Sequence, residues 1–431
     1  METSLFGGLE MAPRDPILGV TEAFVADPNP RKVNLGVGVY NDDSGKLPLL
    51  DCVKRVEKQL TEKAASRGYL PIDGIAAYDK LSQQMVFGTD SEVVTAGRIV
   101  TVQALGGTGA LKVAADFLRR VVPNSVVYIS DPSWENHRAL FEMAGFPVET
   151  YRYYDAATRG LDFAGMLASI EAMAEGSIIV LHACCHNPTG ADPTEQQWGT
   201  ILERVRARNL VPILDLAYQG FGDGIDADAA VVRRFAATPG PIFVASSYSK
   251  SFSLYGERCG ALSIVAADAQ EAMKVLSQVK RTARTNYSSP PTHGGQIVAA
   301  VLASPELRVL WETELTEMRE RIRSIRKRLV DELKDRIPRR LLVRDAPAWD
   351  VLVLGAVQRG RAASAQQVFD LPDRYRPHLR RCSQFAQHRV RRRRDRRRDA
   401  DDRRPQSRRA RRRDACRARR LTTGSRGLST R

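Results

Sequence analysis

The chain has 431 residues, of which 43% are hydrophobic, and a formal net charge of +16. This length fits one large domain or two ordinary ones, and the hydrophobic content excludes a wholly disordered chain. No apolar run reaches the roughly 20 residues that a membrane helix needs, and the acidic, proline-containing N-terminus lacks the pattern of a secretory signal. Six cysteines, two of them adjacent (Cys184 and Cys185), do not suggest a disulfide framework, so we expect a reducing cytoplasm.

The positive charge is concentrated at the C-terminal end of the sequence. Residues 380–431 contain 22 Arg, no Lys and 5 Asp, which gives this segment a net charge of +17 and leaves residues 1–379 at about −1. The basic composition therefore does not indicate that the chain as a whole binds nucleic acid. Because the segment has almost no apolar residues to offset its ordering entropy, we expect it to be disordered.

The first elements in chain order are turns, followed by an alternation of strands and helices. Residues 28–48 are rich in Gly, Pro and Asn, which predicts extended chain and turns, and a helical pattern follows over Asp51–Lys63. Brief apolar runs, typical of strands buried on both faces, then alternate with helical segments, which predicts an α/β fold around a mostly parallel sheet. The predicted strands are Val126–Ser130, Ser177–Ala183, Leu210–Tyr218, Ile242–Ser247 and Gly260–Val265, and the predicted helices are Gly109–Arg120 and Thr194–Arg208.

A long amphipathic helix is predicted after Ser304, which is a good N-cap followed by proline at the first helical position. The helix could link two domains or lie on the surface of one. After about Ile337 the pattern weakens, although residues 362–371 could form a helical turn or two. In the long helix, apolar residues recur at steps of three or four, at Leu307, Trp311, Leu315, Met318, Ile322, Ile325, Leu329 and Leu333.

A lysine between small hydroxyl residues follows one of the predicted strands, in the sequence SSYSK (246–250). If the amine of Lys250 is partly buried near positive charge, its pKa falls and it can form a Schiff base. Ser247 and Arg258 could hold a phosphate beside it. The alternative is an ordinary surface lysine in a serine-rich loop.

Three further segments could bind ligand groups, although a plain turn or helix start explains each one alone. GGTGA (106–110) opens a helix whose backbone N–H groups could approach an anion, but it matches neither a P-loop nor a good dinucleotide fingerprint. HACCHNPTG (182–190) does not suit zinc, because adjacent cysteines cannot both bind one tetrahedral ion, but its Asn187 could face a ligand. In DLAYQG (215–220), Asp215 could pair with a protonated ring nitrogen and Tyr218 could donate to a phenolate.

Together these motifs place an anion site, an amine, an amide, a carboxylate and a phenol at the ends of neighbouring strands. Open α/β sheets bind their ligands at that edge. A phosphate, an aldehyde, a pyridinium nitrogen and a phenolate oxygen are the corresponding groups of pyridoxal phosphate. The combined pattern therefore favours this cofactor, and no metal site is predicted.

The order of these segments resembles the class I aminotransferases, in the aspartate and aromatic-amino-acid branch of the fold-type-I pyridoxal-phosphate enzymes. The resemblance extends from about Asp15 to about Asp335. The sequences of the matching segments favour the aromatic-amino-acid enzymes. The matching segments are VNLGVGVY (33–40), GYLPIDGIAAY (68–78), GGTGALKVAADF (106–117), DPSWENH (131–137), HNPTG (186–190), DLAYQGF (215–221), SSYSKSFSLYGER (246–258) and NYSSPP (286–291).

The resemblance implies roles for individual residues. Lys250 would be the Schiff-base lysine and general base, Asp215 would pair with the pyridine nitrogen, and His137 would support Asp215. Asn187 and Tyr218 would bind the ring oxygen, and Trp134 would stack on the ring. Gly38 would contact substrate, and Arg284 would reach into a partner subunit's site to bind a side-chain carboxylate. The phosphate would be held by Gly107, Thr108, Ser247, Ser249 and Arg258, with Tyr69 from the partner subunit.

The C-terminal part departs from the family pattern. The family has a Ser-Gly-Arg run there, whose arginine binds the substrate α-carboxylate, and no such run follows residue 340. We interpret the arginine-rich text as a shifted reading frame that begins after 337. The alternative is a nucleic-acid-binding extension, but it lacks interleaved aromatic residues and a folded motif.

The sequence thus predicts an α/β protein with a large domain, built on a mostly parallel seven-stranded sheet flanked by helices, and a smaller, disrupted α/β domain. The expected function is ping-pong transfer of an amino group between an aromatic or acidic L-amino acid and 2-oxoglutarate, impaired by the C-terminus, in a cytoplasmic homodimer. The alternative is a catalytically silent pyridoxal-phosphate binder with a basic interaction tail. The expected divisions are an N-terminal arm (1–48), a cofactor-binding domain (49–303), a linking helix with small-domain remnant (304–379) and a tail (380–431).

Overall fold

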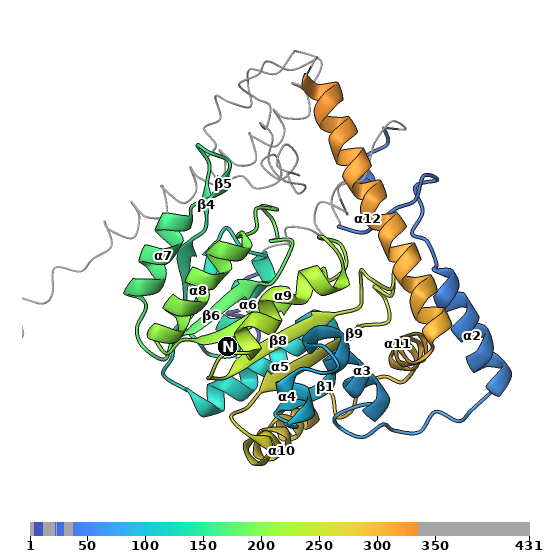
Figure 1. The fold of residues 1–431 in the computed structure, drawn as a ribbon, viewed down its shortest axis with the longest axis horizontal. Helices are drawn as coiled ribbons and strands as arrows, with labels where there is room; N and C mark the ends of the chain where they lie inside the picture. Colours follow the sequence, from blue (N-terminus) through green and yellow to red (C-terminus); the bar gives the residue numbers. More distant parts are fainter. Residues whose placement is uncertain (1–3, 12–21, 23, 30–37, 335–431) are drawn as a thin grey trace, which may run out of the picture. The chain divides into compact units, whose positions relative to one another are not determined.

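The structure, a computed structural model, describes residues 4–11, 22, 24–29 and 38–334 (Figure 1). The expectations for residues 362–371 and for the arginine-rich segment 380–431 lie outside this part of the chain. The predicted division into domains stays a prediction. Within 38–48 the chain forms turns and extended segments, as the glycine and proline content predicts.

A seven-stranded sheet forms the centre of the described structure, with the strand order β1-β9-β8-β7-β6-β2-β3. Every neighbouring pair is parallel except those of β9, which runs antiparallel to β1 and β8. The strands are β1 (Ile99–Leu105), β2 (Val127–Asp131), β3 (Val148–Arg152), β6 (Ile178–His182), β7 (Val211–Leu216), β8 (Ile242–Ser247) and β9 (Cys259–Val265), and a small hairpin adds β4 (Tyr154–Asp155) and β5 (Gly160–Leu161). This architecture confirms the predicted mostly parallel α/β sheet.

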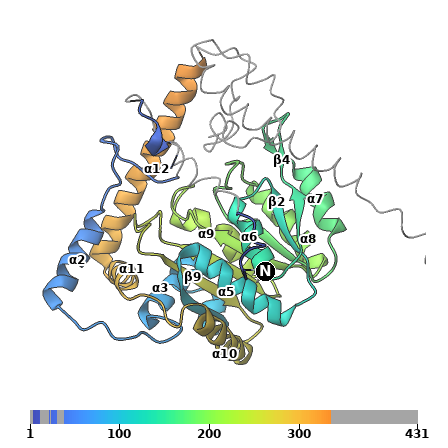
Figure 2. The ribbon, with the colours of Figure 1, turned by 180° about the vertical axis from the view of Figure 1, so that it is seen from behind.

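Helices cover both faces of the sheet (Figures 1 and 2). Residues of α5, α6 and α10 form one hydrophobic core with the sheet, and residues of α2, α3, α7, α8, α9, α11 and α12 form the other. The helices are α2 (Asp51–Lys63), α3 (Ala76–Phe87), α4 (Glu92–Thr95), α5 (Gly106–Val121), α6 (Glu135–Met143), α7 (Phe163–Ala172), α8 (Glu195–Ala207), α9 (Ile225–Ala236), α10 (Ala269–Asn286), α11 (His293–Ala303) and α12 (Pro305–Lys334).

Strand β6 illustrates why continuous apolar runs form the central strands. Ile178 and Val180 belong to one core, whereas Ile179 and Leu181 belong to the other. Successive side chains of a strand point to opposite faces, so a strand covered by helices on both sides is expected to be apolar at most positions. The five predicted strands are confirmed with ends that shift by at most two residues.

The register of the central strands brings their carboxyl ends to one edge of the sheet. His182 of β6 lies opposite Asp215 of β7, and Leu216 of β7 lies opposite Ser246 of β8. Beside them, the backbone N–H of Gly106 at the start of α5 donates to the carbonyl of Arg258, 2.9 Å away. The segments that carry the predicted site residues therefore meet at this edge.

Helix α12 begins as predicted, because the Ser304 hydroxyl accepts a hydrogen bond from the Leu307 backbone N–H at 3.3 Å. The apolar stripe is buried at its start, where Trp311 stacks on Phe252 with ring centres 4.5 Å apart. Further along, Ile325 is 46% exposed. The amphipathic pattern thus packs against the described core only over the first part of the helix.

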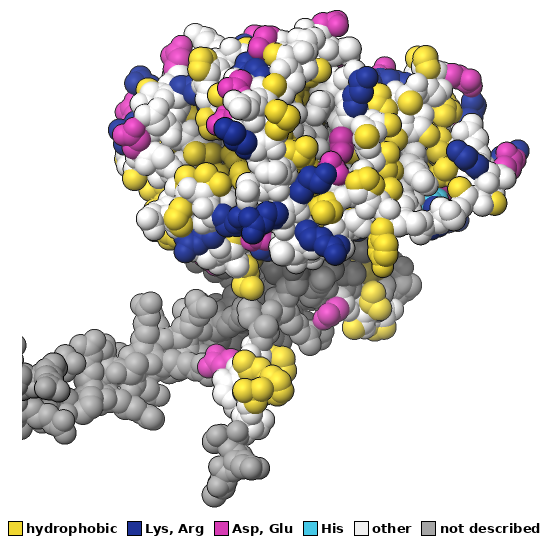
Figure 3. All heavy atoms as spheres, turned by 90° about the horizontal axis from the view of Figure 1, so that it is seen from below, with side chains coloured by type: hydrophobic (Ala, Val, Ile, Leu, Met, Phe, Trp, Pro, Cys, Tyr) yellow, Lys and Arg dark blue, Asp and Glu magenta, His cyan; other side chains and the backbone are white. Residues whose placement is uncertain are grey.

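The surface of the described residues mixes charges, as the near-neutral composition of residues 1–379 leads us to expect. On the face seen in Figure 3, basic, acidic and apolar side chains are interspersed. No described helix is both long and apolar enough to cross a lipid bilayer. The four cysteines in the described segments, Cys52, Cys184, Cys185 and Cys259, are buried free thiols.

Candidate active site

Lys250 lies just beyond the carboxyl end of β8 and is partly buried. Its Nζ lies 4.6 Å from the centre of the Tyr218 ring, and no described residue accepts a hydrogen bond from it or pairs with it. Burial lowers the pKa of the Lys250 amine, and the charge of Arg258 lowers it further, against the opposing effect of Asp215. A lysine with a lowered pKa is more readily available in its neutral, nucleophilic form.

Asp215, in β7, is a buried carboxylate held by His137 of α6. The His137 Nε2 and the Asp215 Oδ2 lie 3.0 Å apart. Burial acts to raise the pKa of Asp215, but the hydrogen bond and charge of His137 outweigh it and hold that pKa below its usual range. Asp215 is therefore an anion inside the protein, a natural partner for a positively charged ring nitrogen.

A hydrogen-bond network extends from His137 away from Asp215. The His137 Nδ1 lies 2.9 Å from the Ser133 hydroxyl, which in turn lies 3.3 Å from the His182 Nε2. Burial lowers the pKa of His182 to about 3, so this imidazole is neutral at physiological pH. Ser133 and His182 were not predicted as parts of the site, because the contact that joins them links residues 49 positions apart in the chain.

Trp134 directly precedes α6 and contacts His137 edge to face, with ring centres 5.2 Å apart. Asn187 follows β6, and its backbone N–H lies 3.4 Å from the His182 Nδ1. The Asn187 side-chain amide makes no hydrogen bond to the described residues. Burial raises the pKa of the Tyr218 phenol, which keeps it protonated and able to donate.

The N-terminus of α5 has the features of an anion-binding site. No side chain caps this end of the helix, and although the Gly106 N–H donates to the Arg258 carbonyl, the next backbone N–H groups can face a ligand. The Arg258 Nη1 donates to the Ser249 hydroxyl at 3.3 Å, and no described carboxylate pairs with this arginine. A side chain at Gly107 would lie 3.3 Å from the Ser247 Cβ, which leaves little room for one. Thr108, the third residue of the helix, is half-buried beside them.

These groups match the chemistry of pyridoxal phosphate. The Asp215 carboxylate suits a protonated ring nitrogen, the Lys250 amine suits an aldehyde, and the uncapped helix with Arg258 suits a phosphate. The site thus offers a separate, correctly charged partner for each functional group of the cofactor.

Three predicted residues do not join this cluster. Tyr69 is 98% exposed in the segment before α3. Gly38 is exposed near the N-terminus, although the neighbouring Tyr40 N–H donates to the Tyr255 hydroxyl at 3.1 Å. Arg284 lies exposed near the end of α10, where it donates to the Ser288 hydroxyl. None of the three has a described contact with Lys250 or Asp215.

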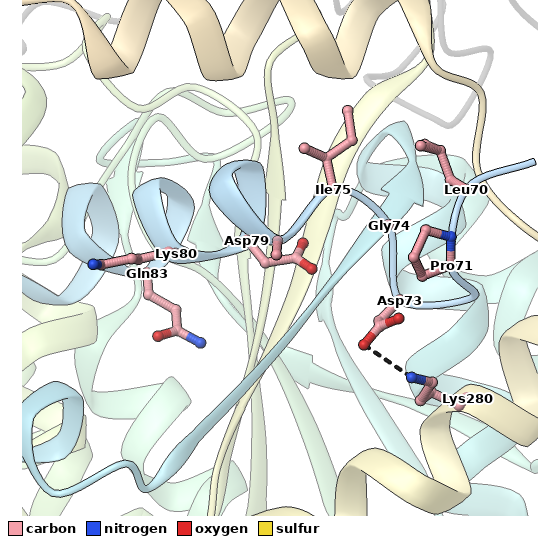
Figure 4. Close-up of a pocket in the computed structure, with 10 residues that line it drawn as sticks. Leu70, Pro71, Asp73, Gly74, Ile75, Asp79, Lys80, Gln83 and Lys280 are labelled. Atoms are coloured by element: carbon pink, nitrogen blue, oxygen red, sulfur yellow. Dashed lines mark hydrogen bonds and ion pairs between the residues drawn. The ribbon is translucent and has the colours of Figure 1, made fainter. Parts of the chain in front are cut away.

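A cavity of about 580 Å³ lies beside the segment that follows Tyr69, where Lys280 of α10 pairs with Asp73 at 3.0 Å (Figure 4). Burial, with the nearby charge of Asp73, raises the pKa of Asp79 to about 9. None of the predicted catalytic residues lines this cavity. Its lining is Leu70, Pro71, Asp73, Gly74, Ile75, Ala76, Asp79, Lys80, Gln83 and Lys280.

Comparisons with known proteins agree with this geometry. Residues 30–355 match the family described as aminotransferase class I and II. The chain is 61% identical over 330 residues to an aspartate aminotransferase of Pseudomonas aeruginosa, covering 77% of this chain and 83% of that protein. It is 48% identical over 327 residues to an aromatic-amino-acid aminotransferase of Escherichia coli, covering 76% and 82%.

Solved structures are equally similar. The crystal structure of an aromatic-amino-acid aminotransferase from Burkholderia pseudomallei, covalently bound to pyridoxal phosphate, superposes with a TM-score of 0.76. It shares 63% sequence identity, and the match covers 77% of this chain and 83% of that one. A psychrophilic aromatic amino acid aminotransferase from Psychrobacter, crystallised with aspartic acid, also gives a TM-score of 0.76, at 44% identity and with 77% and 84% covered.

Proposed function

The chain belongs to the class I and II aminotransferase family, and from this premise we propose that Lys250, Asp215, Asn187 and Tyr218 form the centre of its active site. It is a pyridoxal-phosphate-dependent transaminase. When bound, the cofactor supplies an electron-withdrawing ring that stabilises negative charge at the amino-acid α-carbon. The observation that carries the proposal is the partly buried Lys250 amine, which lies over the Tyr218 ring without a hydrogen bond or ion pair to the described residues and feels the charges of Asp215 and Arg258.

The side chains divide the work of binding and proton transfer. Lys250 would hold the cofactor through its aldehyde, and its Nζ would be the base that moves the substrate α-proton. Asp215, supported by His137, keeps a proton on the ring nitrogen. Asn187 and Tyr218 donate to the ring oxygen, and Trp134 packs on the ring face. The phosphate is bound by Gly107, Thr108, Ser247, Ser249 and Arg258.

The substrates we propose are an aromatic or acidic L-amino acid and 2-oxoglutarate, exchanged in a ping-pong reaction. Aminotransferases named for aspartate and for aromatic amino acids are both strongly similar to this chain. The sequence segments 106–117, 131–137 and 246–258 favour the aromatic group. A cytoplasmic location is proposed with it, since one similar plant enzyme is named as cytoplasmic.

A homodimer with shared active sites would account for Tyr69 and Arg284. Tyr69 and Arg284 are exposed and lie outside the described Lys250 cluster. In the proposed dimer, Tyr69 binds the phosphate in the partner's site, and Arg284 binds a substrate side-chain carboxylate there. Gly38 would contact the substrate at the small-domain side.

The activity of this chain is proposed to be impaired, because no Ser-Gly-Arg run follows residue 340. The missing arginine would bind the substrate α-carboxylate, through charge-assisted hydrogen bonds worth roughly 1.5–3 kcal/mol each. Its loss should weaken substrate binding at least about a hundredfold. If the loss abolishes turnover, the chain is a catalytically silent cofactor binder with a basic tail, which is the alternative function.

A spectroscopic titration tests the proposed function. The purified chain should show a visible absorbance band when pyridoxal phosphate is added, because Lys250 binds the cofactor. Millimolar aspartate or phenylalanine should bleach the band slowly or incompletely. Ordinary turnover at millimolar donor would contradict the impairment, and absence of the band would contradict the assignment of the site.

A further inference from the structure

Asp192 lies behind the turn that carries Asn187. Its Oδ2 accepts a hydrogen bond from the Cys185 backbone N–H at 2.6 Å, and its Oδ1 accepts one from the His186 N–H at 2.8 Å. Both carboxylate oxygens are therefore used on the two residues that directly precede Asn187. Cys185 has a left-handed backbone with φ of +53°, which non-glycine residues seldom adopt, so this turn needs such an external hold.

Asp228, in the first turn of α9, likewise accepts hydrogen bonds from the backbone N–H groups of a turn, the one that begins at Tyr218. Its Oδ2 accepts hydrogen bonds from the backbone N–H groups of Gly220 at 2.8 Å and Gly222 at 2.9 Å, and its Oδ1 accepts one from Asp223 at 2.8 Å. The carboxylate is buried. A side chain at Gly222 would collide with it, so the close approach requires glycine at this position.

Arginines of α12 hold the same turn from its other side. The Arg319 Nη1 donates to the Gly220 carbonyl at 3.0 Å, and the Arg323 Nη2 donates to the Gly222 carbonyl at 2.6 Å. The backbone N–H groups of this turn thus face a carboxylate, while its carbonyls face guanidinium groups. A surface loop without a positioning task needs no such set of charged partners.

We propose that Asp192 and Asp228 are positioning residues of the active site. Asp192 fixes the turn that presents Asn187 to the cofactor ring oxygen, and Asp228 fixes the turn that presents Tyr218 to the same atom. Neither carboxylate touches the cofactor. The inference rests on the proposed function, since it assumes that these two side chains bind the ring oxygen.

Hydrogen exchange in the cofactor-free chain gives the first test. The carboxylates hold the turns before the cofactor arrives, so the amides of Cys185, His186, Gly220 and Gly222 should already be protected without it. Addition of pyridoxal phosphate should change their protection by less than about threefold. Rapid exchange that slows only after the cofactor is added would overturn the proposal, because the cofactor would then order the turns.

Cofactor affinity gives the second test, with Asp192→Asn and Asp228→Asn. An asparagine side chain has one acceptor oxygen, so it must abandon at least one of the backbone donors that the carboxylate held. Each variant should bind pyridoxal phosphate at least tenfold more weakly than the wild type. An analogue without the ring hydroxyl should bind the variants and the wild type within about threefold of each other.

Asp162→Asn is the matched control, because Asp162 also accepts a backbone hydrogen bond, from Gly165 at 2.9 Å, but at the start of α7. This variant should bind both cofactors as the wild type does. In an Asn187→Ala background, the effect of Asp192→Asn should fall below threefold, since its target is already gone. The same loss of effect is expected for Asp228→Asn in a Tyr218→Phe background.

The outcomes separate this inference from the proposed function. If the wild type does not bind pyridoxal phosphate, the proposed function fails. If the wild type binds the cofactor, but each variant lowers the affinity for the cofactor and for the hydroxyl-free analogue equally, the two carboxylates act on overall stability. The positioning role is then wrong. Additive effects with Asn187→Ala and Tyr218→Phe would contradict it in the same way.

Discussion

The two halves of the proposed active site differ in how far this chain completes them. The cofactor side is built from neighbouring strand ends, with Asp215 buried against His137 and Lys250 held near Tyr218. The substrate side depends on Arg284, which is exposed and makes no described contact with that cluster. A preformed cofactor site and a substrate site that needs a second subunit should respond differently to mutation.

The largest effect is expected for Lys250→Ala. Without the amine, no covalent bond to the cofactor can form at this position and no group remains to move the α-proton. The visible absorbance band and all donor-dependent bleaching should disappear. Lys280→Ala is the control, because Lys280 pairs with Asp73 beside the cavity of Figure 4, and this variant should retain the band. A full band in Lys250→Ala would show that another lysine binds the cofactor.

Asp215→Ala should retain the cofactor but lose most of the reaction rate. The ring nitrogen no longer has a buried anion that keeps its proton, so negative charge at the α-carbon is poorly stabilised. A loss of several factors of ten is expected, each worth about 1.4 kcal/mol of barrier. The rate is best measured in a relative whose C-terminal arginine is present. A loss of less than tenfold would exclude the role.

How much of this cofactor side could be predicted depends on where each partner lies in the sequence. Strands β2, β6, β7, β8 and β9 were predicted because each contains a brief apolar run, although they also bury polar residues such as His182, Asp215 and Ser263. Strand β1 was missed, because it buries Thr101 and Gln103. Their polar groups are satisfied by the Ser263 hydroxyl at 2.8 Å and the Pro291 carbonyl at 2.9 Å, which local sequence does not reveal.

The edge strand β3 was missed for a different reason. Only Val148 and Tyr151 are buried, whereas Glu149, Thr150 and Arg152 are exposed, so the strand forms no continuous apolar run. Helix α5 begins at Gly106, three residues before its predicted start, because glycines at a helix N-terminus resemble a loop in sequence.

The site residues, like the strands, were predictable where a local sequence pattern marked them. Residues in local motifs, such as Lys250 and Asn187, were identified from the sequence and its resemblance. Ser133, Asp192 and Asp228 were not, although most of their hydrogen-bond partners lie only four to eight residues away in the chain. The local sequence does not show which backbone N–H groups or side chains such a polar residue will bind, and the folded structure does.

Arg284→Ala should have an intermediate effect that is confined to dicarboxylates. The variant loses a charge-assisted contact worth roughly 1.5–3 kcal/mol, so the binding of a non-reacting dicarboxylic acid such as maleate should be about tenfold weaker or more. A monocarboxylic analogue should be affected less than threefold. Binding is measured through the absorbance of the bound cofactor.

Subunit mixing shows on which side of the interface Arg284 acts. In a hybrid of Arg284→Ala with Lys250→Ala subunits, one of the two sites contains both an intact lysine and an intact arginine. Tight dicarboxylate binding should therefore return in the mixture. Its failure to return, in a preparation shown to contain hybrid dimers, would place Arg284 in its own subunit's site.

The smallest effect concerns stability at the cavity of Figure 4. Because burial raises the pKa of Asp79 from 3.8 to about 9, the folded protein binds a proton there that the unfolded chain releases. The stability contributed by this proton is full below pH 3.8 and is lost as the pH rises towards 9, by up to about 1.4 kcal/mol per pH unit.

Asp79→Asn mimics the protonated carboxyl group and removes this loss. Its gain in unfolding free energy over the wild type should be at least about 1 kcal/mol larger at pH 8 than at pH 5, measured by urea denaturation. Asp90→Asn, which changes an exposed carboxylate beyond the end of α3, should give no such gain. A gain that is equal at both pH values would contradict the buried, protonated state of Asp79.

Borohydride reduction of the cofactor-loaded chain, followed by peptide mass spectrometry, tests the central assignment most directly. Reduction fixes the bond between the cofactor and the amine that holds it, so the mass of the cofactor should be found on the peptide that contains Lys250. The preformed cofactor side predicts this single label even in a chain with little turnover. A label on a different lysine, or no label at saturating pyridoxal phosphate, would contradict it.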